Sequence, residues 1–193
     1  GQTIAIGTAT DPYQPAERRF RLTRGMLEAL RGWRGLSIGI ITKSPLILRD
    51  VDVLKELAER HEVTVNISIT SVDPLLLRRL EARSPAPHAR LRAVKGLVDA
   101  GIHAGLMVAP VVPGVSDSRE QLAAVMAAGK AAGARYVIGA ALRLGPAARA
   151  RFLREAEERL GVAECGGALA GHGISSVSPQ RAARDGRPAR SRR

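Results

Sequence analysis

The chain has 193 residues, of which 45% are hydrophobic and 25% charged, and its 30 basic against 18 acidic side chains give a formal net charge of +12. This balance is typical of a folded protein and excludes a chain that is disordered throughout. The single cysteine, Cys165, excludes a disulfide framework and, within this chain alone, an iron–sulfur cluster held by three or four thiolates. No apolar run reaches the roughly 18 residues of a membrane-spanning helix, so we expect a cytoplasmic protein with no membrane partner.

A unit of strand, loop and helix is predicted to recur five times. Short runs of Ile, Val and Ala that barely alternate with polar residues predict buried strands at residues 4–7, 36–42, 63–69, 103–109 and 135–141. Helical periodicity predicts helices at residues 16–31, 51–60, 87–100, 118–132 and 147–160. Asp50 is expected to cap the second helix, and Ser118 to form a capping box with Gln121. Gly101 and Gly133 follow predicted helix ends, where glycine is favoured.

This alternation predicts an α/β fold with a parallel sheet and helical crossovers. Two architectures fit the pattern, a doubly wound sheet and an arc of a β/α barrel. In both, the loops at the carboxyl ends of the strands carry the chemistry. We therefore expect a functional site at that edge of the sheet.

Polar side chains follow the first three predicted strands. Asp11 could receive an ammonium group, although an Asx turn before Pro12 is an equal alternative. Lys43 directly follows an apolar strand and could receive a carboxylate, or it could be a solvated loop lysine. Thr10 and Ser68 offer hydroxyl groups to a ribose or a carboxylate. Together these groups favour a small zwitterionic or polyhydroxylated ligand.

Several common catalytic motifs are absent from the sequence. Neither a Walker phosphate-binding loop nor a GxGxxG dinucleotide fingerprint occurs at a strand-to-helix turn, and there is no GxSxG nucleophile elbow. The four histidines lie far apart with no carboxylates at metal-ligand spacing, which argues against a histidine metal site.

Basic residues gather in two places. Residues 163–193 are rich in Gly, Ser, Pro, Ala and Arg, so we expect a domain at residues 1–162 followed by a basic, disordered tail. Arg18, Arg19, Arg21 and Arg24 surround the start of the first predicted helix. They could bind nucleic acid through phosphates, or they could form an ordinary solvated helix face.

Four separate segments resemble one known family. They are IAIGTATDPYQPAE at residues 4–17, ITKS at 41–44, LEARSPAP at 80–87 with Arg90, and GIHAGLMVAPVVPG at 101–114. In order and spacing they resemble the radical S-adenosylmethionine (SAM) enzymes related to spore photoproduct lyase, over about residues 4–144. The resemblance implies a partial (β/α) barrel of about five parallel strands, the second to sixth strands of the family, with helices outside.

The resemblance also implies two cofactors. In that family a CxxxCxxC loop holds a [4Fe–4S] cluster, which binds SAM and cleaves it to a 5′-deoxyadenosyl radical that abstracts hydrogen from the substrate. This sequence has no CxxxCxxC motif. We therefore expect SAM as a cofactor, and the cluster only in a longer chain that carries the motif. Since the chain starts at Gly1 rather than Met, we expect it to be a piece of such a protein and inactive alone.

Carried over by position, the family's cofactor-binding residues fall on three groups of positions. Thr10 and Asp11 match the segment near the methionyl end of SAM, and Lys43 and Ser68 match residues that contact SAM. The strand lining the adenine is matched by Met107, Val108 and Ala109. Thr8 is a further candidate cofactor-binding residue. It stands where spore photoproduct lyase has a cysteine that returns hydrogen to the product, and a hydroxyl group is unsuited to that role. A lyase-like DNA repair activity therefore does not follow.

Two alternatives to a radical SAM enzyme stay open. One is a catalytically silent, basic nucleic-acid-binding protein that uses the arginines of the first helix and the tail. The other is an unrelated β/α-barrel enzyme that acts on a small phosphorylated metabolite. The substrate is not indicated by the sequence.

Overall fold

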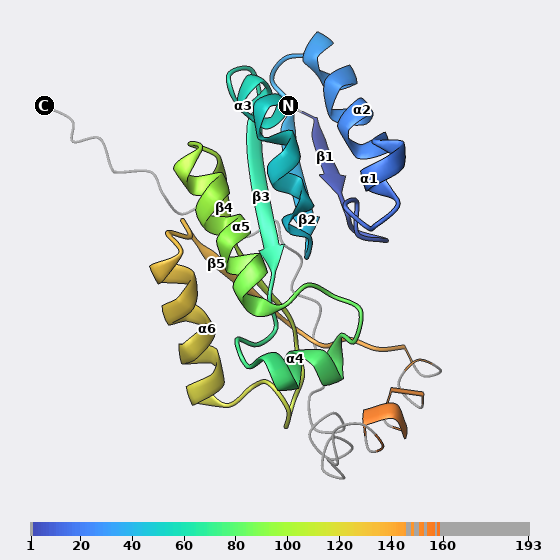
Figure 1. Ribbon diagram of the computed structural model, residues 1–193, viewed down its shortest axis with the longest axis vertical. Coiled ribbons are helices and arrows are strands. Elements are labelled where there is room, and N and C mark those ends of the chain that lie inside the picture. The colour runs from blue at the N-terminus through green and yellow to red at the C-terminus, as the bar shows by residue number, and fades with distance from the viewer. Residues whose placement is uncertain (1, 146–147, 149–150, 153, 157, 159–193) are drawn as a thin grey trace, which may run out of the picture.

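Five parallel strands form one sheet with the order β1-β2-β3-β4-β5 (Figure 1). The computed structural model describes residues 2–145, 148, 151–152, 154–156 and 158. The strands are β1 (Thr3–Ile6), β2 (Ser37–Thr42), β3 (Glu62–Ser68), β4 (His103–Val111) and β5 (Val137–Ala141). The predicted α/β fold with an all-parallel sheet is confirmed, and the sequential strand order is that of a barrel arc rather than a doubly wound sheet.

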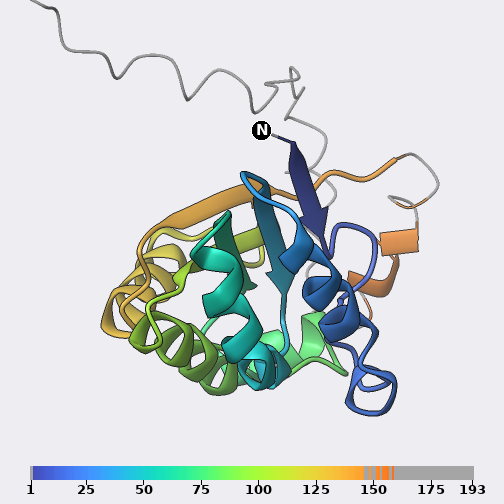
Figure 2. The same cartoon turned by 90° about the horizontal axis from the view of Figure 1, so that it is seen from above.

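Helices connect each strand to the next. Between β1 and β2 lie α1 (Glu17–Phe20), α2 (Leu22–Ala29) and the 3₁₀ turn η1 (Leu30–Gly32). The later connections contain η2 (Pro45–Asp50) with α3 (Val51–Ala58), then α4 (Pro74–Leu80) with α5 (Pro87–Asp99), and finally α6 (Arg119–Ala131). Seen from above, α2, α3, α5 and α6 lie along one face of the sheet (Figure 2).

The core lies between the sheet and these helices. Ile40, Val65 and Ala104 are neighbours across β2, β3 and β4, and each is completely buried. Alternate residues of a strand point to opposite faces, so one helix-facing row of apolar side chains runs across the sheet. β1 and β5 are its edges, and all five residues of β5 are exposed.

Helix ends differ from the sequence expectation in two places. The predicted helix 16–31 breaks at Arg21, whose φ of 52° is left-handed, because the Glu17 carboxylate accepts hydrogen bonds from the backbone N–H groups of Thr23 and Arg24 and so begins α2. The expected cap by Asp50 is wrong. Its side chain makes no capping hydrogen bond, because its carboxylate is held by Arg24 and Arg49 instead.

Other predicted ends are confirmed. Ser118 and Gln121 form the expected capping box at the start of α6. Gly101 and Gly133 follow α5 and α6 with φ values of 85° and 81°. Helix α4 and the turn η2 were not predicted.

Part of the expected organisation lies outside the described residues. This holds for the tail at 163–193, for its boundary with the domain at 162, for Cys165 and for much of the predicted helix 147–160. Among the residues that the structure describes, no helix combines the length and the apolar character needed to cross a bilayer.

Candidate functional site

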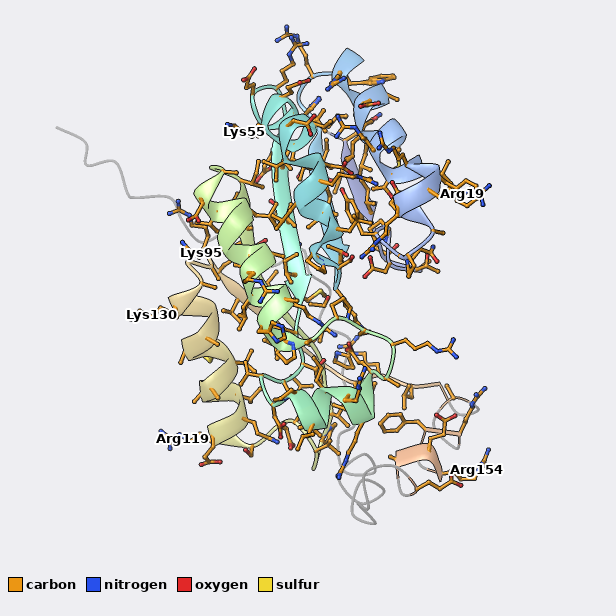
Figure 3. All side chains as sticks on the ribbon, viewed as in Figure 1. Arg19, Lys55, Lys95, Arg119, Lys130 and Arg154 are labelled. Atoms are coloured by element: carbon orange, nitrogen blue, oxygen red, sulfur yellow. The ribbon has the colours of Figure 1, made fainter. Side chains whose placement is uncertain are left out.

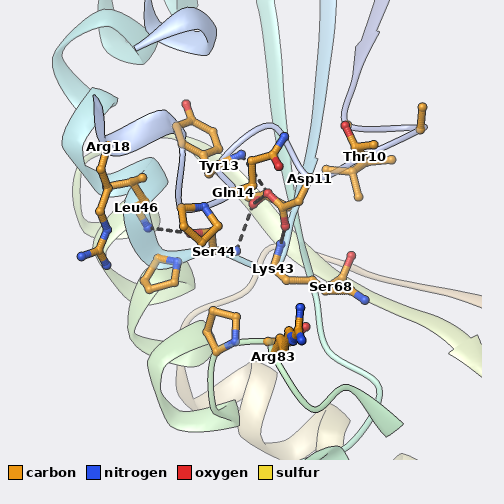
Figure 4. Close-up of a pocket in the computed structure, with 18 residues that line it drawn as sticks. Thr10, Asp11, Tyr13, Gln14, Arg18, Lys43, Ser44, Leu46, Ser68 and Arg83 are labelled. Carbon is orange, nitrogen blue, oxygen red and sulfur yellow. Dashed lines mark hydrogen bonds between the residues drawn. The ribbon is translucent and has the colours of Figure 1, made fainter. Parts of the chain in front are cut away.

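A pocket of about 820 Å³ lies at the carboxyl ends of β1, β2 and β3 (Figure 4). The loop after β1 forms one wall, the segment after β2 forms the floor, and the segment between α4 and α5 closes the opposite side. Its polar and charged lining residues are Thr10, Asp11, Tyr13, Gln14, Arg18, Thr42, Lys43, Ser44, Ser68, Arg83 and Ser84. The lining is completed by Gly7 and by the apolar residues Ala9, Pro15, Ile41, Pro45, Leu46 and Pro85. Such a mixture suits a ligand that has both an apolar ring and charged groups.

Asp11 fastens the loop after β1 to the end of β2. Its carboxylate accepts hydrogen bonds from the backbone N–H of Tyr13 at 2.8 Å, the hydroxyl of Thr42 at 2.6 Å and the backbone N–H of Lys43 at 2.8 Å. A carboxylate has about four acceptor positions, so three are used within the protein. The Asx-turn alternative is therefore what the structure contains, with two further bonds that hold the wall of the pocket.

Lys43 is held in an ion-pair chain. Its ammonium group lies 3.0 Å from Oε1 of Glu81, and the other oxygen of Glu81 lies 2.5 Å from the guanidinium of Arg90. The Lys43 side chain is 36% exposed, whereas that of Arg90 is completely buried. Burial opposes the ionised form of Glu81, but Arg90 and Lys43 beside it hold its pKa below the usual range. Lys43 is thus an ion-paired side chain rather than a solvated loop lysine.

The hydroxyl-bearing residues Thr10 and Ser68 approach this pocket from β1 and β3 (Figure 4). Ser68 is 5% exposed, while Thr10 is exposed to solvent. The structure therefore brings together Thr10, Asp11, Lys43 and Ser68, as expected for one site. Their contacts with SAM stay a prediction.

The remaining sequence candidates do not line the pocket. Thr8 is exposed on the loop after β1. Met107 is the register partner of Ser68 and so lies on the same face of the sheet, with Ala109 two residues beyond it. Val108 points the other way and is 4% exposed in the hydrophobic core, so its side chain is unavailable to a ligand in the pocket.

Sequence reasoning missed several residues of this site. Glu81 and Arg90 lie in segments that resemble the family, but no local pattern shows that they pair with Lys43. Arg18 and Arg83 line the pocket, and within the described part of the chain neither guanidinium has a hydrogen-bond or ion-pair partner. The sequence indicated Arg18 only as a possible phosphate contact at the start of the first helix, and no local pattern indicated Arg83, which lies between α4 and α5.

The arginines near the first helix differ in solvent exposure and in ion pairing. Arg18, Arg19 and Arg21 are exposed, and Arg19 extends away from α1 with its guanidinium 5.2 Å from the ring centre of Phe20 (Figure 3). Arg24 is instead paired with Glu28, Asp50 and Asp52 and is 21% exposed. Hydrogen bonds from Arg24 lower the pKa of Asp52 to about 2.

No group of three or more His, Cys, Asp or Glu side chains in the described part of the chain is arranged to hold a metal ion. One cysteine cannot supply the three thiolates of a [4Fe–4S] cluster. The residues of this chain therefore do not fit the cluster.

The sequence profile of the radical SAM superfamily matches residues 2–126. This chain belongs to the radical SAM superfamily. The five-stranded parallel sheet with its helices on one face is consistent with part of a radical SAM barrel, and the matched range includes the whole pocket. Superfamily membership argues against the alternative that the chain is an unrelated β/α-barrel enzyme.

Three relatives are uncharacterized proteins. Rv2578c of Mycobacterium tuberculosis is 41% identical over 133 residues, which are 69% of this chain and 39% of that protein. MJ0683 of Methanocaldococcus jannaschii is 31% identical over 114 residues, which are 59% of this chain and 42% of that protein. ORF301 of Acidianus two-tailed virus is 31% identical over 114 residues, 58% of this chain and 36% of that protein. The chain thus spans about two fifths of the length of these relatives, and no solved structure matches it.

Proposed function

We propose that this chain forms the SAM-binding part of a radical SAM enzyme. The observation that carries the proposal is the meeting of Thr10, Lys43 and Ser68, from three strand ends, around one pocket. SAM, when bound, supplies the carbon–sulfur bond that enzymes of the superfamily break. The three thiolates for a cluster would come from polypeptide outside this chain, because the sequence contains one cysteine.

Different residues are proposed to contact different parts of SAM. Lys43 carries an ammonium group that can receive the carboxylate of the methionyl end. Ser68 and Thr10 offer hydroxyl groups to the ribose. Met107 is outside the pocket lining, but it is the register partner of Ser68 on the same sheet face and would offer apolar contact to a base that extends beyond the pocket. Asp11 acts mainly by holding the loop, with one acceptor position left for an ammonium group.

The proposal extends to a branch of the superfamily related to spore photoproduct lyase. It is supported by the order and spacing of the four segments at residues 4–17, 41–44, 80–87 and 101–114. Thr8 occupies the position of the hydrogen-returning cysteine, and this favours a reaction other than DNA-lesion repair.

Binding of SAM to this chain tests the proposed function. We expect weak binding by isothermal titration calorimetry, since no iron is there to chelate the amino-acid end, and about tenfold weaker binding after Lys43→Ala. Lys130 extends from the outer side of α6 and provides a matched control, so Lys130→Ala should bind like the wild type (Figure 3). Equal affinities of the wild type and Lys43→Ala, or no binding at millimolar SAM, would overturn the proposal.

A nucleic-acid partner is a second candidate function. It is supported by the exposed guanidinium groups of Arg18, Arg19 and Arg21, whereas Arg24 is already paired with carboxylates. If these arginines contact phosphates, the chain should bind random-sequence DNA with an affinity that falls steeply as the salt concentration rises. Replacing these three arginines by alanine should reduce both the affinity and its salt dependence in a filter-binding assay. Binding that is unchanged by the triple substitution would remove this surface from consideration.

A further inference from the structure

Arg90 joins two segments beside the pocket although it does not line the pocket itself. It lies in the first turn of α5 and is completely buried. Its Nε donates to the carbonyl of Pro85 at 2.8 Å, and one terminal nitrogen donates to the carbonyl of Ser68 at 2.9 Å. The other terminal nitrogen donates to Glu81 at 2.5 Å. One rigid guanidinium thus ties the end of β3 to the segment between α4 and α5.

Glu81 links the buried guanidinium of Arg90 to the ammonium group of Lys43. It immediately follows α4, and its carboxylate is shared between the buried guanidinium and the half-exposed ammonium group. A lysine side chain at the rim of a pocket otherwise samples many rotamers, each of which places its charge elsewhere. The ion pair with a fixed carboxylate restricts Lys43 to the side of the pocket next to Ser68 (Figure 4).

The charges of the three residues sum to one positive charge. Glu81 neutralises one of the two cations, so the group can still receive one carboxylate from a ligand. A guanidinium keeps its proton at any physiological pH, which makes Arg90 a permanent anchor. Burying a charge is costly unless it is paired and hydrogen-bonded, and each of the three guanidinium nitrogens of Arg90 donates one hydrogen bond, to Pro85, Ser68 or Glu81.

We propose that Arg90, acting through Glu81, is a positioning residue that sets Lys43 for the carboxylate of the ligand. This inference rests on the proposed SAM site. A purely electrostatic role makes a different prediction. Glu81→Gln adds one positive charge to the site, so electrostatics alone predicts stronger binding of a carboxylate, whereas positioning predicts weaker binding.

Two nucleosides separate these roles, S-adenosylhomocysteine, which has the amino-acid carboxylate, and 5′-methylthioadenosine, which lacks it. We expect the wild-type chain to prefer S-adenosylhomocysteine by about tenfold in calorimetric titrations. Arg90→Lys and Glu81→Gln should each abolish this preference and leave the affinity for 5′-methylthioadenosine within twofold. The exposed Arg92 of the same helix provides the control, and Arg92→Ala should keep the preference. A retained or larger preference in Glu81→Gln, or an equal loss of both ligands in Arg90→Lys, would overturn the positioning role.

A measurement without ligand keeps the inference separate from the proposed function. The sequence contains four lysines, so a ¹³Cε-lysine NMR spectrum has four signals, and the Lys43 signal is assigned by its loss in Lys43→Ala. Arg90→Lys adds a fifth lysine signal, so Lys43 is identified in that background by the signal lost in the double variant Arg90→Lys/Lys43→Ala. We expect the Lys43 signal to report a restricted side chain in the wild type and a mobile one in Arg90→Lys. An unchanged Lys43 signal in Arg90→Lys would refute the inference even where SAM binds. Absence of nucleoside binding together with the expected NMR change would refute the SAM site and leave the Arg90–Glu81–Lys43 coupling supported.

Discussion

The hydroxyl of Thr42 donates a 2.6 Å hydrogen bond to the carboxylate of Asp11, and this bond joins the ends of two neighbouring strands. Thr42 is the last residue of β2, and Asp11 belongs to the loop after β1. Thr42 also accepts a hydrogen bond from the backbone N–H of Ser44. The wall formed by the loop after β1 and the floor formed by the segment after β2 are therefore fixed relative to each other before any ligand binds, which lowers the entropy cost of binding.

Asp11→Asn should destabilise the chain by about 1–3 kcal/mol. The substitution keeps the shape but puts an amide where one carboxylate oxygen accepts a hydrogen bond from Lys43 or Tyr13, and it removes the charge that strengthens all three bonds. Urea unfolding followed by circular dichroism gives the free energy of unfolding. The control is Asp99→Asn, where an exposed carboxylate pairs with exposed Lys95, and a change within about 0.5 kcal/mol is expected. Equal midpoints for the two variants would contradict the role of Asp11.

Gly7 permits the close approach of β1 to β2 at the pocket. Its φ is 93°, and a Cβ atom there would overlap the carbonyl oxygen of Ile41 and lie 2.9 Å from Pro12. We expect Gly7→Ala to cost several times more stability than Gly35→Ala, because Gly35 has a similar φ of 70° but open space around it. The difference between the two unfolding free energies isolates the steric overlap from the backbone strain. Similar losses in both variants would show that the loop relaxes around the added methyl group.

The sequence was sufficient for the sheet because each strand is a short apolar run that ends at a loop containing Gly, Pro or Asp. All five strands were predicted within two residues of their observed ends, and the segment pattern was sufficient for the superfamily. Helix α4 could have been found as well, because Asp73 caps it and Pro74 occupies its first turn, which are both local signals.

Other features depend on residues far apart in the sequence. The helix break at Arg21 follows from the position of the Glu17 carboxylate, and the failed cap at Asp50 follows from Arg24, 26 residues earlier. The pairing of Lys43 with Glu81 likewise requires the end of α4 to pack beside the end of β2. Strand periodicity places Lys43 at the correct edge of the sheet, but only the packed fold shows what holds its ammonium group.

The lowered pKa of Glu17 predicts that the free energy of unfolding decreases in acid. Burial opposes its ionised form, but hydrogen bonds from the backbone of Thr23 and from Arg49 hold its pKa below the usual range. A carboxyl with a lowered folded-state pKa stabilises the protein above its unfolded pKa of about 4.3, and this contribution is lost as the pH falls through the folded-state value.

We therefore expect Glu17→Gln to be less stable than the wild type at pH 7 and to lose less stability between pH 5 and pH 3. Urea midpoints measured at several pH values test this. Glu81 also has a lowered pKa, so the variant should keep part of the acid sensitivity. Parallel stability profiles of the two proteins would show that Glu17 is not a source of the pH dependence.

Gly105 lets Tyr136 lie across β4, on the sheet face opposite the core helices. The hydroxyl of Tyr136 donates to Oδ1 of Asn66 on β3 at 3.1 Å, so the ring must pass over the strand between them. A Cβ atom on Gly105 would lie 2.6 Å from both the ring and the carbonyl oxygen of Tyr136, and the carbonyl belongs to the backbone that pairs with β4. Gly105→Ala should therefore cost about 1–3 kcal/mol and weaken the attachment of β5. Gly139→Ala in β5 has open space and is the matched control, with a change near zero or slightly stabilising. Hydrogen exchange of the β5 amides should accelerate in Gly105→Ala alone, and equal exchange in the two variants would show that Tyr136 does not need the glycine.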